Sequence, residues 1–193
     1  MGGSVRRLAL FGLPGSGKST TAIFLDEAVR SAGAVGVRLK LAEPLYGLQS
    51  EVYEICGRPL PDPYRQDGKL LAMLGQHLRR INPTVLTDDF RRRLQHRVRG
   101  LPEDAQVIVI CDDMRPVDAA AMHEMGFEMT HVLCTQQISS RRIIDRGDLA
   151  VEDGVQPLEA GIPLLSADHV IKNDGDIEDL IRNVEEFVKE LLS

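Results

Sequence analysis

The segment from Gly12 to Ser19, with the sequence GLPGSGKS, constrains this chain more than any other part of it. Its glycines permit backbone conformations that other residues rarely adopt, so consecutive N–H groups can turn toward one point. A short apolar segment precedes the loop, and a stretch with apolar residues at helical spacing follows it. A glycine loop between a strand and a helix N-terminus is a cradle for phosphate groups, so the sequence predicts a nucleotide site here.

The loop residues have separate expected roles toward ATP, the phosphoryl donor that this pattern favours. Lys18 is expected to reach the β- and γ-phosphates, and the Ser19 hydroxyl to ligate Mg²⁺, the expected cofactor. Thr20 is expected to assist at the α-phosphate. The loop residues predicted to bind ATP are Gly12, Pro14, Gly15, Ser16, Gly17, Lys18, Ser19 and Thr20.

Short apolar segments alternate with helical patterns along the chain. This alternation predicts an α/β class with three layers, in which a parallel sheet of about five strands is covered by helices on both faces. Strands are expected at residues 5–11, 34–41, 106–111, 128–134 and 169–172. Helices of the core are expected at residues 18–32, 116–125, 139–146 and 177–192.

The length of 193 residues predicts one domain with an insertion. Residues 1–44 and 101–193 are expected to form the core, and residues 45–100 a helical insertion that binds the phosphoryl acceptor. A lid is expected at about residues 136–160. Within the insertion, helical patterns cover residues 45–56, 64–80 and 88–98.

Two carboxylates follow the clearest buried strand. Asp112 and Asp113 come directly after it, and the carboxyl ends of parallel strands are where ligands gather. A carboxylate here can hold Mg²⁺ or orient the acceptor. Asp112 is favoured for the metal, Asp113 is the alternative, and capping of the next helix is a competing role for the pair.

Positive charge gathers in two regions. Arg142 and Arg146 lie four residues apart and thus on one helical face, where they are expected to stabilise the transferring phosphoryl group. A solvated basic face, with an Arg141–Asp145 pair, is the alternative interpretation.

On the acceptor side, arginine forks suit a phosphate-bearing acceptor, and Arg65, Arg79 and Arg80 are the candidates. The run from Arg91 to Arg93 is expected to be exposed surface. Lys40 lies at the carboxyl end of the second predicted strand and Glu43 follows it, so both are expected near the acceptor, although Glu43 could instead be an acidic residue at a helix start.

Composition narrows the range of functions. A net charge of −6 disfavours general nucleic-acid binding, and no apolar run is long enough for a membrane span. The expected partner is a small molecule, while a homodimer stays open. Three scattered cysteines suit a reducing cytoplasm, and they are expected to be small buried residues.

Together with the loop, further stretches resemble the deoxynucleoside monophosphate kinase-like branch of the P-loop kinases. They lie at residues 41–45, 64–65, 74–83, 111–116, 142–148 and 167–175. The resemblance implies ATP-dependent phosphorylation of a nucleoside 5′-monophosphate to the diphosphate. It also implies that Arg65 and Arg80 hold the acceptor phosphate, that Arg115 lies near the acceptor, and that Arg142 and Arg146 serve the lid. Asn173 falls in the nucleotide-side turn, so it is expected to bind ATP.

The chain departs from this pattern at Gln76 and His77, where the family commonly has a hydroxyl and an acidic residue, and at residues 84–86. These departures leave the acceptor open, since the layout is also similar to kinases of phosphomevalonate and dephospho-coenzyme A. A nucleotide-dependent switch is the alternative of another class. It would be expected to carry a water-orienting glutamine where this chain has Met114 and Arg115.

Overall fold

The computed structural model describes residues 4–62, 65–145 and 165–193. In these residues five strands form one parallel sheet in the order β2-β3-β1-β4-β5. The predicted α/β class with a parallel sheet is therefore confirmed. In β1, Leu8 lies opposite Ile110 of β3 on one side and Glu128 of β4 on the other. The strands are β1 (Val5–Phe11), β2 (Val35–Leu39), β3 (Val107–Cys111), β4 (Glu128–Leu133) and β5 (His169–Lys172).

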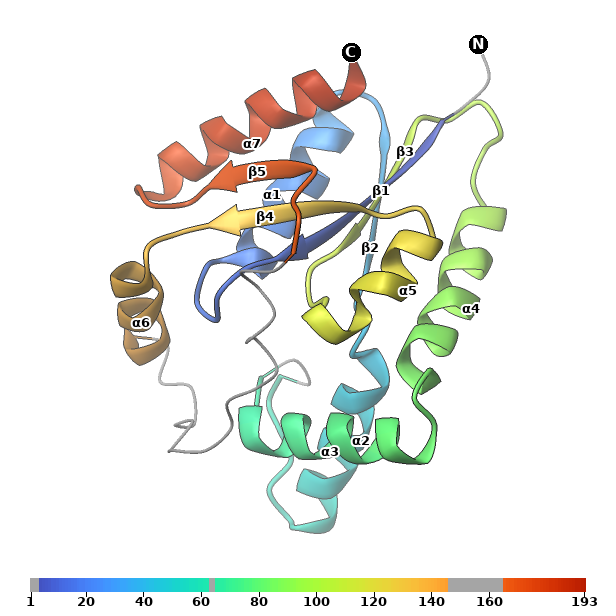
Figure 1. Cartoon of the computed structure of the whole chain (residues 1–193), viewed down its shortest axis with the longest axis vertical. Coiled ribbons are helices and arrows are strands. Elements are labelled where there is room, and N and C mark those ends of the chain that lie inside the picture. Colours follow the sequence, from blue (N-terminus) through green and yellow to red (C-terminus); the bar gives the residue numbers. More distant parts are fainter. Residues whose placement is uncertain (1–3, 63–64, 146–164) are drawn as a thin grey trace.

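Helices cover both faces of the sheet (Figure 1). The helices α1 (Lys18–Ser31) and α7 (Ile177–Leu192) share a buried cluster with Leu8 and Leu10 of β1. The next residues along β1, Ala9 and Phe11, belong to the cluster on the opposite face, under α4 (Val85–Arg99) and α5 (Ala119–Glu124). Because successive side chains of a strand point to opposite faces, a strand buried on both sides is a continuous apolar run.

The insertion contributes α2 (Glu43–Ile55), α3 (Gly68–Ile81) and α4, and the first two lie beyond the carboxyl end of β2 (Figure 1). The helix α2 begins two residues earlier than predicted, with Pro44 in its first turn, where a missing N–H is harmless. The helix α3 begins four residues later than predicted, because Asp67 caps it by accepting the Leu70 N–H at 3.0 Å.

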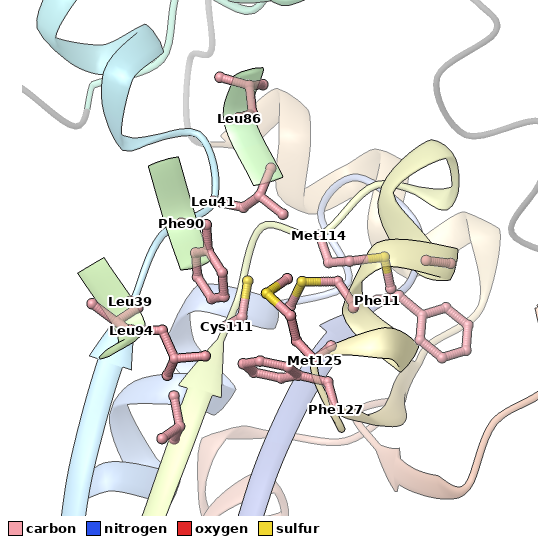
Figure 2. Close-up of a cluster of buried hydrophobic side chains, with 14 of the residues drawn as sticks. Phe11, Leu39, Leu41, Leu86, Phe90, Leu94, Cys111, Met114, Met125 and Phe127 are labelled. Carbon is pink, nitrogen blue, oxygen red and sulfur yellow. The ribbon is translucent and has the colours of Figure 1, made fainter. Parts of the chain in front are cut away.

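The helix α4 is docked on the sheet by one apolar stripe. Figure 2 shows Leu86, Phe90 and Leu94 directed toward the cluster that contains Leu39 and Cys111. The three α4 residues are four apart, so they lie on one face and fix the rotation of the helix about its axis. The remaining faces of α4 are thereby turned away from the core.

The rest of the described chain forms η1 (Pro116–Asp118), a 3-10 helix, and α6 (Gln136–Asp145). The helix α6 covers the first part of the expected lid, and the remainder, together with Arg146, lies outside the described residues. Cys111 and Cys134 are buried as expected, but the prediction is wrong for Cys56, which follows the end of α2 and is exposed. No helix in the described ranges has the length and apolar character that a membrane crossing requires.

Candidate active site

The loop between β1 and α1 depends on glycine at its turns. Gly12, Gly15 and Gly17 all have positive φ angles, of 147°, 73° and 90°. A Cβ on Gly15 would collide with the Ser139 carbonyl oxygen, and one on Gly17 with the Asn173 side chain. Backbone conformation and close packing therefore both exclude larger residues at these positions.

Lys18 lies folded over this loop. Its Nζ donates to the carbonyl oxygens of Gly12 and Leu13, each at 2.9 Å. These two hydrogen bonds hold the ammonium group against the loop. The Ser16 hydroxyl at the same loop is buried and has no hydrogen-bond partner among the described residues.

Asn173, which follows β5, supports the loop from behind. Its buried side-chain amide donates to the Ser16 carbonyl oxygen at 2.7 Å. The backbone carbonyl oxygen of Asn173 accepts a hydrogen bond from Arg142 Nη1 at 3.1 Å. Arg142 also donates to the backbone carbonyl oxygen of Gly175 at 3.4 Å. Arg142 of α6 is therefore held beside the loop. The alternative Arg141–Asp145 pair is present too, at 3.9 Å on the exposed side of α6.

The two carboxylates after β3 have different surroundings. Asp112 is 3% exposed, and its two oxygens accept from Lys40 Nζ at 3.1 and 3.2 Å. Asp113 instead accepts the backbone N–H groups of Leu41 and Ala42, at 2.6 and 3.0 Å. Desolvation raises the pKa of Asp113, and the neighbouring Asp112 charge adds to the rise. Asp113 thus fixes the chain that follows β2. Neither carboxylate caps the next helix, whose N-cap residue is Arg115.

A cavity of about 1020 Å³ connects the loop with the insertion. Ser19 and Asp112 line it from the core, and Lys40 lines it at the end of β2. A hydroxyl and a carboxylate on one cavity wall are the hard oxygen donors that Mg²⁺ prefers, so these two residues fit the expected metal. Of the predicted acceptor residues, Glu43 and Arg65 also line this cavity.

The structure does not bring Arg79, Arg80 or Arg115 to the lining of this cavity. Arg79 Nη2 donates to both carboxylate oxygens of Asp118 at 2.9 Å, and Asp118 is 4% exposed. Burial raises the pKa of Asp118, and the Arg79 charge opposes that rise. Arg79 therefore ties α3 to η1. Arg80, the next residue, points to solvent.

Several cavity residues were not anticipated from the sequence. Arg92 and Arg93 line the cavity. The run from Arg91 to Arg93 was predicted to be exposed surface, which holds for Arg92, whereas Arg93 is partly buried. His96 and Arg97 line the cavity as well. The sequence signal that could have grouped these four basic residues is their spacing of three and four residues. That spacing places them on one face of a helix.

Tyr46 of α2 is a further unanticipated residue of the cavity wall, and Lys40 Nζ lies 5.9 Å from the centre of its ring. Burial is the main cause that raises the pKa of its hydroxyl, and the charges of Asp113 and Asp112 add to it, opposed by Arg115. The phenol is thus a neutral part of the cavity wall.

No family model matches the chain, and no curated protein matches it in sequence. Solved structures, in contrast, match the chain in fold. TT1252 from Thermus thermophilus is 23% identical, with a TM-score of 0.57 over 96% of this chain and 97% of that one. APS kinase from Mycobacterium tuberculosis, in complex with AMPPNP and APS, is 17% identical, with a TM-score of 0.55 over 99% of both chains.

Shikimate kinase from Bacteroides thetaiotaomicron is 15% identical, with a TM-score of 0.52 over 97% of this chain and 99% of that one. The likeness runs over nearly the full length of each chain. The chain therefore has the three-layer α/β fold of the P-loop kinases.

Proposed function

We propose that this chain transfers the γ-phosphoryl group of ATP to the phosphate of a nucleoside 5′-monophosphate, which yields ADP and a nucleoside diphosphate. The observation that carries the proposal is the single cavity shared by Ser19, Asp112, Lys40 and Arg65. Donor-side and acceptor-side groups line the same open cavity, as a direct transfer between two phosphates requires. The structural likeness to APS kinase and shikimate kinase, both named as kinases of small molecules, supports the reaction class.

On the donor side, the loop N–H groups and the N-terminus of α1 would hold the triphosphate. Lys18, already held against the loop, would move from the Gly12 and Leu13 carbonyls to phosphate oxygens. Ser19 and Asp112 would hold Mg²⁺, which when bound neutralises charge on the β- and γ-phosphates. The neighbour that binds AMPPNP supports ATP as the donor.

On the acceptor side, Arg65 and Lys40 would hold the acceptor phosphate, and Glu43 would accept from a sugar hydroxyl or base amino group. An oxygen of that phosphate attacks the γ-phosphorus while the bond to the β,γ-bridging oxygen breaks, with the two oxygens in line. The attacking phosphate oxygen is already deprotonated near neutral pH, so no side chain has to act as a general base. The contribution of the protein is positioning and charge stabilisation, with Arg142 on the side of the transferring group.

The test is a coupled assay of ADP formation from ATP with a panel of ribo- and deoxynucleoside monophosphates, phosphomevalonate and dephospho-coenzyme A. We expect turnover with a nucleoside monophosphate, and a loss of several orders of magnitude in the Lys18→Ala variant with its melting temperature retained. A non-nucleotide acceptor as the only active one would move the chain to another kinase specificity. ATP hydrolysis that needs no acceptor would instead identify a switch, and normal turnover without Lys18 would contradict the proposed site.

A further inference from the structure

The cavity is longer than transfer between two phosphates requires. The helix α4 lines it with Asp89, Arg92, Arg93, His96 and Arg97. At a rise of about 1.5 Å per residue, Asp89 and Arg97 are about 12 Å apart along the helix axis. The spacing of three and four residues makes these side chains one continuous stripe, which we call the α4 row. The cavity therefore continues along α4 beyond the residues assigned to the acceptor phosphate.

The core packing of α4 gives the α4 row its direction. Leu86, Phe90 and Leu94 are buried against the sheet, which leaves the row on a neighbouring face of the helix (Figure 2). Because three buried side chains hold the helix, the row cannot turn away from the cavity without disrupting the core. Arg38 of β2, the strand at the edge of the sheet, lines the cavity across from α4.

The row carries more positive charge than its own carboxylate can balance. Asp89 accepts from both Arg92, at 3.0 Å, and Arg93, at 2.7 Å. Nη2 of Arg93 is buried and has no hydrogen-bond partner within the described ranges. Among those same residues, Arg97 forms no ion pair that would offset its charge. A surplus of guanidinium groups beside a cavity favours phosphate or carboxylate, which match their planar fork.

We infer that the α4 row, with Arg38, binds a second anionic group of the acceptor, a phosphate or a carboxylate, at the end remote from the phosphate that is attacked. The inference rests on the proposed function and narrows its substrate class to phosphate esters with two separated anionic groups. A plain nucleoside monophosphate would leave the row without a ligand. A nucleotide with a further phosphate or carboxylate on its sugar or base would occupy both ends of the cavity.

Calorimetric titration tests the inference independently of turnover. The protein is first saturated with Mg²⁺ and AMPPNP, so that the glycine loop cannot capture the added phosphate compound. Adenosine 5′-monophosphate is then compared with adenosine 3′,5′-bisphosphate, and with phosphomevalonate as the carboxylate-bearing compound. We expect at least one of the two bis-anionic compounds to bind about tenfold more tightly than the monophosphate, and the better one identifies the second group.

The variants Arg97→Ala and Arg92→Ala are expected to remove this preference and to leave the affinity for the monophosphate unchanged. Arg99→Ala is the matched control, because Arg99 lies on the same helix but lines a separate cavity of about 510 Å³. Thermal melting of each variant checks that the helix stays folded. Arg92 is a useful second position because its side chain is 77% exposed, so its removal leaves packing intact.

Equal affinities for all three compounds would overturn the inference. An equal loss of affinity for the monophosphate and for the bis-anionic compounds in Arg97→Ala and Arg92→Ala would overturn it too. The outcome for the proposed function is separate. Turnover of a monophosphate without a preference for a second anion would retain the kinase assignment and reject the subsite. Preferential binding of a bis-anionic compound without any phosphoryl transfer would retain the subsite and reject the kinase assignment.

Discussion

Lys40 and Asp112 form an ion pair across the mouth of the candidate metal site, with Nζ 3.1 and 3.2 Å from the two carboxylate oxygens. Lys40 comes from the chain directly after β2, and Asp112 from the chain directly after β3. The side chains are 17% and 3% exposed, so among the residues that the structure describes the carboxylate has its charge balanced by Lys40. A divalent cation bound at Asp112 would take over that role and leave Lys40 for the acceptor phosphate.

The first prediction concerns Lys40→Met. Because the change leaves a buried carboxylate without its cation, we expect the free energy of unfolding to fall by about 2–3 kcal/mol. Mg²⁺ with ATP is then expected to raise the melting temperature more in the variant than in the parent, since the metal replaces the missing charge. The double variant Lys40→Met/Asp112→Asn is the control, and it should lose the extra response. An equal shift in all three proteins would argue against Asp112 as the metal-side carboxylate.

The second prediction compares two glycines with similar backbone angles. Gly17 has φ 90° and its Cβ position is occupied by the Asn173 side chain, whereas Gly33 has φ 83° and open space around it. Gly33→Ala is expected to cost about 1–2 kcal/mol from backbone strain alone and to retain nucleotide binding. Gly17→Ala is expected to cost more and to abolish binding of a fluorescent ATP analogue. Equal affinities in the two variants would contradict the role assigned to the loop.

The third prediction separates structural from ligand-binding arginines. Arg79→Ala breaks a buried ion pair, so we expect a loss of about 3–5 kcal/mol in the free energy of unfolding, measured in urea, and little change in KM for the acceptor. Arg65→Ala is the converse, because Arg65 lines the cavity at an exposed position. It should raise the acceptor KM about tenfold or more with stability unchanged. A raised acceptor KM in Arg79→Ala, with stability lost in Arg65→Ala instead, would indicate that Arg79 binds the acceptor.

The fourth prediction concerns Asn173→Asp, which keeps the size of the side chain but replaces the amide donor by a carboxylate. The Ser16 carbonyl would lose the hydrogen bond that it accepts at 2.7 Å and would face a negative charge. We expect a loss of about 1–3 kcal/mol in stability and a weaker affinity for ATP, measured by calorimetry. An ATP affinity equal to that of the parent would show that the loop does not need this support.

The fifth prediction is a pH dependence that arises from His131. Its ring stacks on Phe11 at 4.7 Å, and burial, assisted by the Lys18 charge, lowers the pKa of the imidazole. Above its ordinary pKa of about 6.5 the ring is neutral in both the folded and the unfolded chain, so it contributes no pH dependence there. Below that value the unfolded chain takes up the proton first, and stability falls as the pH drops toward the folded-state pKa.

The measurement for His131 is urea unfolding at pH 7.5 and at pH 5.5. His131→Phe keeps the aromatic stack but cannot be protonated, so its loss of stability between the two conditions should be smaller than that of the parent. An identical loss in both proteins would assign the acid sensitivity to other groups.

The sequence by itself determined the glycine loop and the elements on either side of it. The places of Gly15, Gly17 and Lys18 follow from local pattern, because a strand, a glycine turn and a helix start are contiguous in the chain. The parallel sheet was readable for a similar reason, since strands buried on both faces are short apolar runs such as residues 107–111. Helix boundaries were less readable: α3 begins at its Asp67 cap, later than predicted, whereas α2 and α4 begin earlier than predicted without a side-chain cap.

Only the tertiary structure decided which charged residues share the cavity. Arg79 and Arg65 have the same chemistry and lie on the same insertion, yet one is bound to Asp118 and the other lines the cavity. Likewise, Asp112 and Asp113 are neighbours in sequence, but one contacts Lys40 and the other the backbone after β2. These assignments depend on contacts between residues 39 to 72 positions apart. Local pattern carries no information about such contacts, because packing of whole helices against the sheet creates them.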